Sequence, residues 1–167
     1  MTRLFLMRHA KARWAEPGSR DYDRGLELSG RADADMIASS MLLAGYVPQK
    51  VLCSGARRAR ETWEAAARHL AVSDVDYLDG LYSSDAGGYL EIIRKAGGAG
   101  PVLVVGHNPM MEDLTTALAR DGEPEAMQTV AGGFPTSGVA VIRLASPLDA
   151  IAPGGGFLED FLAPRDI

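Results

Sequence analysis

The chain has 167 residues, of which 47% are hydrophobic and 23% charged, which is ordinary for a globular protein and suits a single domain over residues 1–167. Its formal net charge of −5 disfavours nucleic acid or an anionic membrane as a partner, so an anionic ligand needs a locally basic pocket. The lone Cys53 leaves no intramolecular disulfide, and the amino-terminal apolar run is too short for a membrane span or signal peptide, so we expect a cytoplasmic protein.

The amino-terminal half alternates strand and helix patterns. Residues 4–7 (LFLM) predict a buried strand that ends at an Arg-His pair. Residues 29–44 predict a helix with Ser29 as its N-cap and a glycine as its stop. Residues 51–53 (VLC) predict a second buried strand. Residues 56–70 predict a helix with an apolar stripe, whose arginines and glutamates form i,i+4 pairs on the solvated side.

The carboxyl-terminal half continues this alternation. Residues 87–96 and 109–120 predict helices, the second with Asn108 as its cap and a proline at its first position. Between them, residues 102–105 (VLVV) predict a third buried strand that ends at a Gly-His pair, and residues 139–144 (VAVIRL) predict a last strand. We find no internal repeat and no interdomain linker.

Strands that alternate with helices predict right-handed crossovers, a mainly parallel sheet and helices on both faces, which is a three-layer α/β/α sandwich. In such sheets, ligands bind beyond the carboxyl ends of the strands. If the predicted strands are neighbours, then Arg8, His9, residues 54–58 and His107 lie at the same edge.

Two of the three histidines, His9 and His107, directly follow predicted strands, which favours a shared site, whereas His69 near a helix end is interpreted as a surface residue. Arg8 adjoins His9, and Arg58 lies near the positive end of a helix dipole. A neutral imidazole can attack phosphorus while guanidinium groups stabilise the equatorial oxygens, so this set suits metal-independent phosphoryl transfer. A backbone carbonyl bonded to the other ring nitrogen would keep the attacking nitrogen unprotonated, and His107 would serve as a protonated donor.

These segments resemble the signatures of the histidine phosphatase superfamily, which has the phosphoglycerate mutase-like fold. Residues 8–10 (RHA) resemble its Arg-His-Gly signature, residues 54–62 (SGARRARET) its second arginine motif, and residues 106–109 (GHNP) its second histidine motif. The resemblance runs nearly end to end, because residues 22–34 and 134–144 are similar to segments of the small SixA-type phosphohistidine phosphatases.

The resemblance implies that His9 is a nucleophile that becomes transiently phosphorylated, with no metal and no cofactor. It implies that three residues hold the phosphoryl group: Arg8, Arg58 and His107. Two departures from the family pattern, Ala10 for glycine and Gly55 for a frequent proline, leave the side-chain chemistry intact.

Four further residues are weaker candidates. Arg24 and Ser137 lie in segments similar to the SixA pattern and are expected at the rim, although Arg24 also suits a surface ion pair and Ser137 a turn. Many superfamily members protonate an alkoxide leaving group with a carboxylic acid after the middle strand, where this chain offers no clear glutamate, only Asp79 or Asp85. Imidazole, with a pKa of about 6.5, leaves with less assistance, so we expect phosphohistidine on a protein as the substrate.

Other chemistries fit less well. A cysteine phosphatase needs an arginine six residues after Cys53, where Ala59 stands, and residues 74–76 (DVD) lack a convincing strand before them. No P-loop or HExxH pattern is present, and neither His9 nor His107 precedes an aspartate. Two alternatives remain open: a phosphomonoesterase acting on a small sugar or nucleotide phosphate, and a non-catalytic phosphate-binding module on the same fold. The oligomeric state is not predicted.

Overall fold

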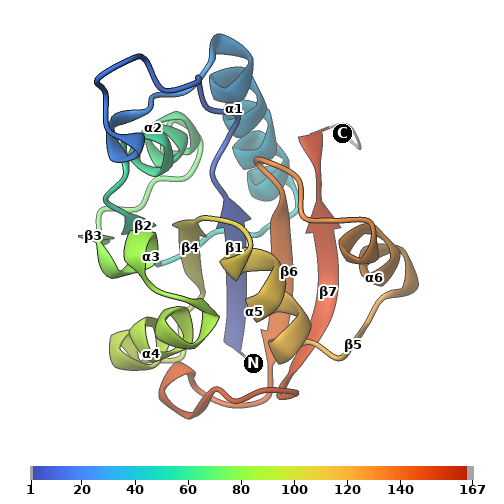
Figure 1. Ribbon diagram of the computed structural model, residues 1–167. Coiled ribbons are helices and arrows are strands. Elements are labelled where there is room, and N and C mark those ends of the chain that lie inside the picture. The colour runs from blue at the N-terminus through green and yellow to red at the C-terminus, as the bar shows by residue number, and fades with distance from the viewer. Residues whose placement is uncertain (1, 165–167) are drawn as a thin grey trace.

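The computed structural model describes residues 2–164. Its strands are β1 (Thr2–Arg8), β2 (Lys50–Ser54), β3 (Val75–Leu78), β4 (Val102–Gly106), β5 (Asp121–Gly122), β6 (Val139–Leu144) and β7 (Gly156–Leu162). They form one sheet in the order β3-β2-β4-β1-β6-β7-β5 (Figure 1). The four strands from β3 to β1 pair in parallel, β6 is antiparallel to both β1 and β7, and β5 is parallel to β7. The expectation of a mainly parallel sheet is confirmed.

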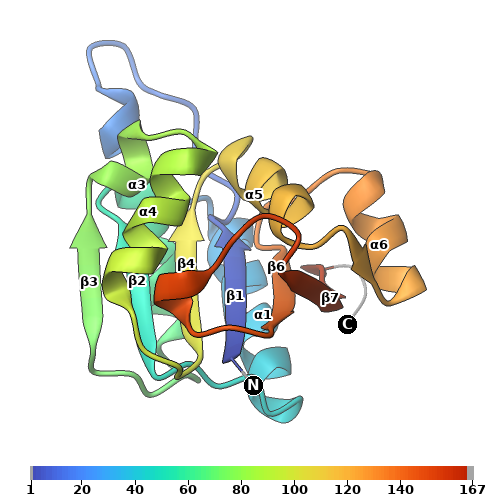
Figure 2. The same cartoon turned by 90° about the horizontal axis from the view of Figure 1, so that it is seen from below.

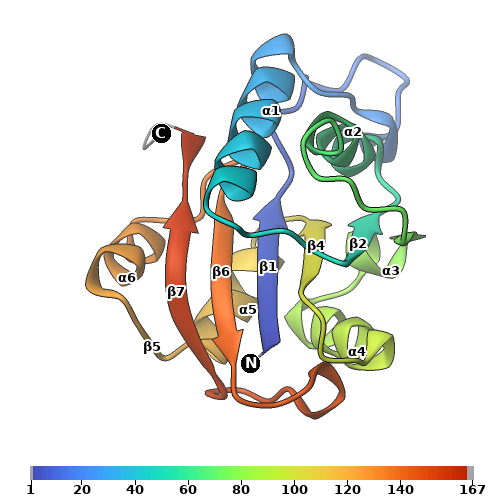
Figure 3. The same cartoon turned by 180° about the vertical axis from the view of Figure 1, so that it is seen from behind.

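Helices cover both faces of the sheet. They are α1 (Leu28–Leu43), α2 (Arg57–Ala66), α3 (Gly80–Ser83), α4 (Ala86–Ala96), α5 (Met110–Leu118) and α6 (Pro124–Ala131), with short 3-10 turns η1 (Asp21–Asp23) and η2 (Leu148–Ala150). Figure 1 shows α4 and α5 in front of the sheet, and Figure 3, from behind, shows α1 and α2 on the opposite face.

The alternation of side chains along each central strand builds two separate cores. In β1, Phe5 and Met7 pack in the cluster that contains the buried residues of α1 and α2. Leu4 and Leu6 pack in the other cluster, with the buried residues of α4 and α5. Burying each such side chain stabilises the fold by roughly 1.5–3 kcal/mol relative to exposure. The three-layer α/β/α architecture is therefore confirmed.

Each of the four predicted helices begins one residue away from its predicted start. The prediction of Ser29 as an N-cap is wrong, because α1 begins at Leu28 with Glu27 at the N-cap. The Glu27 carbonyl already accepts a hydrogen bond from the Arg31 N–H at 3.1 Å, which starts the helix earlier. In α5 the first helical residue is Met110 rather than the proline before it.

The carboxyl ends of β1, β2 and β4 meet at one edge, as expected. Figure 2 shows the parallel arrows pointing to the end of the molecule where the blue connection between β1 and α1 projects. The backbone N–H of His9 donates to the carbonyl of Gly106 at 2.9 Å, which ties the end of β1 to the end of β4. The backbone alone therefore brings together the strand ends that carry the predicted site residues.

Candidate active site

His9 follows β1 directly and has one ring nitrogen fixed. Its Nδ1 lies 2.7 Å from the carbonyl oxygen of Ala10. Because a carbonyl only accepts, Nδ1 carries the proton and Nε2 keeps a free lone pair. Burial lowers the pKa of His9 to about 4, assisted by the positive charges of Arg58 and Arg8 and opposed by the bond to Ala10. The imidazole is therefore neutral at pH 7, and Nε2 is the ring nitrogen that carries a lone pair.

Arg58, in the first turn of α2, contacts that nitrogen. Its Nε donates to His9 Nε2 at 3.3 Å, while Nη1 donates to the Asp21 carbonyl at 2.9 Å and Nη2 to the Asp21 carboxylate at 3.1 Å. The neighbouring Arg57 instead pairs with Glu61 at 3.1 Å, as the helical spacing predicted. The structure thus brings Arg58 into the site and leaves Arg57 on the outside of the helix.

His107 follows β4 and lies beside His9, with 5.2 Å between the ring centroids. Its Nε2 is 2.8 Å from the hydroxyl of Ser54, at the end of β2, and its backbone N–H donates to the Tyr89 hydroxyl at 3.1 Å. Burial, and then the neighbouring His9 and Arg58, lower the pKa of His107 to about 3. Unlike the expected protonated donor, His107 is neutral at pH 7 in this unliganded site.

Arg8 and Ser137 complete the cluster. Nη1 of Arg8 donates to the Phe134 carbonyl at 2.8 Å. Ser137 is fully buried at a backbone φ of 61°, and its N–H donates to the carbonyls of both Arg8 and His9 at 3.2 Å. This left-handed conformation is uncommon outside glycine. It holds the Ser137 side chain next to the end of β1.

Unpartnered polar atoms concentrate at this edge. Among residues 2–164, five buried side-chain nitrogens or oxygens make no hydrogen bond. Two of them are carboxylate oxygens that are held in ion pairs with arginines elsewhere. The other three are Arg8 Nε, His107 Nδ1 and Ser137 Oγ. Because a buried polar group without a partner costs about 1–3 kcal/mol, three of them around one histidine pair indicate a site built for a ligand.

The weaker candidates lie around this cluster. Arg24 pairs with the Asp21 carboxylate at 3.0 Å, the surface ion pair considered above. Asp79 accepts a hydrogen bond from the Tyr22 hydroxyl at 2.6 Å. Asp85 is the N-cap of α4 and accepts from the Gly88 N–H at 2.9 Å. Both carboxylates therefore act as acceptors in structural contacts.

Two further polar residues near the cluster, Asp21 of η1 and Tyr82 of α3, were not predicted as site residues. The Tyr82 hydroxyl donates to the Asp21 carboxylate at 2.9 Å, and the Tyr82 ring packs edge-on against both Tyr22 and His107. Asp21 was considered only as a partner for Arg24. No periodicity marks these residues, because they reach the site through the packing of loops.

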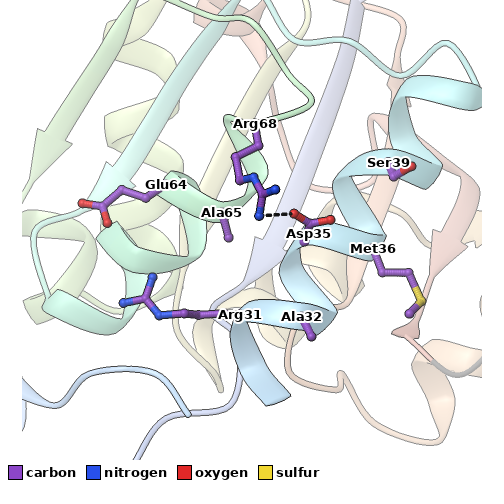
Figure 4. Close-up of a pocket in the computed structure, with 8 residues that line it drawn as sticks. All are labelled: Arg31, Ala32, Asp35, Met36, Ser39, Glu64, Ala65 and Arg68. Atoms are coloured by element: carbon purple, nitrogen blue, oxygen red, sulfur yellow. Dashed lines mark ion pairs between the residues drawn. The ribbon is translucent and has the colours of Figure 1, made fainter. Parts of the chain in front are cut away.

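A groove of about 610 Å³ lies elsewhere, between α1 and α2 (Figure 4). Three of its charged side chains form ion pairs: Arg68 with Asp35 at 3.1 Å, and Arg31 with Glu61 at 2.9 Å. None of its lining residues belongs to the histidine cluster. We therefore place the candidate active site at the strand ends and not in this groove.

Comparison with known proteins agrees with this placement. Residues 4–91 match the sequence model of the histidine phosphatase superfamily (branch 1). An uncharacterized protein of Mycobacterium tuberculosis is 34% identical over 166 residues, which cover 95% of this chain and all of the relative. The chain belongs to the histidine phosphatase superfamily. A crystal structure from Agrobacterium tumefaciens, provisionally assigned as the phosphohistidine phosphatase SixA, is 40% identical, with a TM-score of 0.82, and covers 98% of this chain and 99% of that one.

Within the superfamily, this histidine phosphatase is of the SixA type. A mycobacterial glucosyl-3-phosphoglycerate phosphatase is similar in fold alone, at 16% identity and a TM-score of 0.65 over 91% of this chain and 95% of that one. Burial raises the pKa of the Cys53 thiol, which argues against a cysteine nucleophile. Within the described residues, no helix has the length and apolarity needed to cross a bilayer.

Proposed function

We propose that this phosphatase removes the phosphoryl group from phosphohistidine on a protein, through a phosphorylated His9 and without a metal. The observation that carries the proposal is the trio of unpartnered atoms around a neutral His9: Arg8 Nε, His107 Nδ1 and Ser137 Oγ. All three can present a proton to a phosphoryl oxygen. In the His107 tautomer that does so, the Ser54 hydroxyl donates to Nε2 and Nδ1 carries the proton.

The reaction then has two displacements. His9 Nε2 attacks phosphorus, the bond from phosphorus to the substrate nitrogen breaks, and the electron pair of that bond returns to the leaving imidazole. A water molecule next attacks phosphorus, and the bond from phosphorus to His9 Nε2 breaks. The electron pair of that bond returns to His9, and inorganic phosphate departs with the protons of the water, of which one can pass to bulk solvent. Arg8 and Arg58 stabilise the equatorial oxygens in both steps, because their guanidinium groups remain charged throughout.

The contacts of the two aspartates indicate which kind of leaving group the site can release. Asp79 accepts a hydrogen bond from Tyr22, and Asp85 accepts one from Gly88 at the start of α4, so both carboxylates already have structural partners. A phosphorylated imidazole that is protonated on its other nitrogen leaves as neutral imidazole and needs no further acid. An alkoxide leaving group has no such route. This contrast favours a phosphoramidate over a phosphate ester.

The names of similar proteins support the same choice, because the 40% identical structure is the one assigned as a phosphohistidine phosphatase. The small-ester alternative has support only from folds at low identity. We take the partner to be a phosphorylated protein, and the cytoplasmic location remains a prediction.

The test is a parallel assay on a phosphohistidine protein, a phosphoserine peptide, and small sugar and nucleotide phosphates, with quenched samples analysed for phosphate on His9. We expect turnover of phosphohistidine at least about tenfold above that of any ester, and an acid-labile, base-stable adduct that is absent from His9→Ala.

The outcomes separate the alternatives. Higher turnover of a sugar or nucleotide phosphate would assign the phosphomonoesterase activity. Phosphate binding without any adduct, in folded protein and across the whole panel, would assign the non-catalytic module. Full activity of His9→Ala would refute the mechanism.

A further inference from the structure

We propose that Asp21 is a positioning residue that holds the Arg58 guanidinium in the orientation needed to receive the phosphoryl group on His9. The inference rests on the proposed function. It assigns a role to a residue that lies 37 positions before Arg58 in the chain and on a separate element, the turn η1.

The geometry of the guanidinium carries the argument. Arg58 uses its Nη1 and Nη2 groups together on Asp21, the first on the carbonyl at 2.9 Å and the second on the carboxylate at 3.1 Å. This double contact occupies the end of the planar fork. The side edge, with Nε, faces His9 Nε2 at 3.3 Å. Asp21 therefore fixes the plane of the Arg58 guanidinium through its two terminal nitrogens. The Nε–H on the opposite side remains directed at His9 Nε2.

The Asp21 side chain is half exposed, but its carboxylate has three hydrogen-bond donors. Its carboxylate accepts from Arg24 at 3.0 Å and from Tyr82 at 2.9 Å, besides Arg58. Burial acts against ionisation, but these donors outweigh it and lower the pKa of Asp21 to about 2. The anion therefore persists across the working pH range.

The arrangement also explains how one arginine serves both states of the enzyme. In the free site, the Arg58 Nε–H bonds to the lone pair of His9 Nε2. Once Nε2 is bonded to phosphorus that lone pair is gone, and the same N–H is left facing a phosphoryl oxygen. Because Asp21 holds the terminal nitrogens of the guanidinium, the Nε–H changes its acceptor from His9 to the phosphoryl oxygen with little movement. The reaction then needs little reorientation of Arg58.

The experiment is a double-mutant cycle of Asp21→Asn and Arg58→Lys, with Asp23→Asn as the matched control. Asp23 lies in the same turn but pairs with the exposed Arg20. The readout is the single-turnover rate of His9 phosphorylation by a phosphohistidine protein. We expect Asp21→Asn to slow this step by about tenfold or more, but by less than about threefold in the Arg58→Lys background, because lysine has no fork to orient. Asp23→Asn should leave the rate unchanged.

A second readout does not depend on activity. The Nε–H resonance of Arg58 in ¹⁵N-labelled protein should shift and broaden in Asp21→Asn and stay in place in Asp23→Asn. The positioning role would be overturned if Asp21→Asn caused the same loss of rate in the wild-type and the Arg58→Lys backgrounds. An Arg58 resonance that does not move would also overturn it. A wild-type enzyme that forms no phosphorylated His9 would instead overturn the proposed function, while the resonance still decides whether Asp21 orients Arg58.

Discussion

Two imidazoles and two guanidinium groups share one site, and burial decides which of them are charged. His9 and His107 both lose water, and the adjacent arginines further disfavour their protonated forms. In the proposed mechanism, a neutral His9 needs no general base to remove a proton before it attacks. The same proposal assigns to the arginines the positive charge that binds the substrate.

The first prediction concerns the ionisation of His9. We expect ¹⁵N-histidine NMR of the unliganded protein to show His9 titrating near pH 4, well below the ordinary 6.5. His9→Ala and His107→Gln identify the signals of these two residues among the three histidines, and the second variant also removes a group that interacts with His9. Titration of His9 near pH 6.5 would mean that a cationic His9 competes with nucleophilic attack at neutral pH.

Gly55 provides a prediction about space. A Cβ built on this residue would overlap both the Asp79 carboxylate and the Tyr22 hydroxyl. These two groups form a hydrogen bond of 2.6 Å directly beside Gly55. Gly55→Ala should therefore break that bond and lower the free energy of unfolding by about 1 kcal/mol. Urea unfolding measures the change.

The control for Gly55 is Gly87, in the first turn of α4, where a Cβ would lie 3.4 Å from the Asp85 carboxylate, an ordinary contact. Gly87→Ala should stabilise the protein by about 0.5–1 kcal/mol, because alanine restricts the unfolded chain. A Gly55→Ala loss that stays the same in a Tyr22→Phe background would show that the tyrosine hydroxyl is not the obstacle.

The sequence predicted those site residues that strand ends supply. Arg8 ends β1, His9 and His107 directly follow β1 and β4, and Arg58 stands in the first turn of the helix after β2. Asp21 belongs to a connection between β1 and α1 that carries no periodic signal, and its contacts span dozens of residues. Such contacts depend on how a loop folds back over the sheet, which no local pattern records.

At the level of elements, the central strands were predictable and the strands toward the two sides of the sheet were not. The strand β7 was missed because its buried residues Leu158 and Phe161 are three apart, a spacing typical of a helix. The irregular register opposite Val141 and Ile142 in β6 produces this spacing. The edge strand β3 was missed because it is too polar and too exposed to show a buried pattern.

The contact between α1 and α2 includes a charged clamp that gives the third prediction. Asp35 of α1 bonds to His69 at 2.9 Å and to Arg68 at 3.1 Å, both just after the end of α2 (Figure 4 shows the pair with Arg68). The bond to His69 is the main cause that lowers the pKa of Asp35. Asp35→Ala should reduce the melting temperature and leave the rate of His9 phosphorylation unchanged, because the clamp lies away from the histidine cluster.

A matched control is Asp33→Ala, two residues away and therefore on another side of α1, where it lines a groove with Pro135 and Thr136. Since the lowered pKa belongs to the folded state, the stabilisation by Asp35 is present above its ordinary pKa of 3.8 and is lost as the pH falls below it. Equal melting temperatures for both variants at pH 7 would show that the clamp contributes nothing measurable, as exposed ion pairs sometimes do.

For the whole molecule, a net charge of −5 surrounds the site that is proposed to bind a phosphoryl group. Two arginines make this site locally positive: Arg8 at the end of β1 and Arg58 in the first turn of α2. The burial that keeps the histidines neutral also makes the stability of the protein depend on pH, because the unfolded chain exposes both imidazoles to water.

The last prediction follows from that dependence. In the unfolded chain each histidine binds a proton near pH 6.5, whereas in the folded protein the pKa of His107 is about 3 and that of His9 about 4. As the pH falls below 6.5 the unfolded state therefore gains protons that the folded site excludes, and the free energy of unfolding decreases. Between pH 7 and pH 5 each histidine accounts for a loss of about 2 kcal/mol in the free energy of unfolding.

Urea unfolding of the wild type and His107→Gln at both pH values isolates the contribution of His107, because other ionisable groups contribute alike to the two proteins. The loss on acidification should be smaller in His107→Gln by about 2 kcal/mol, and equal losses would mean that His107 is protonated in the folded site at pH 5.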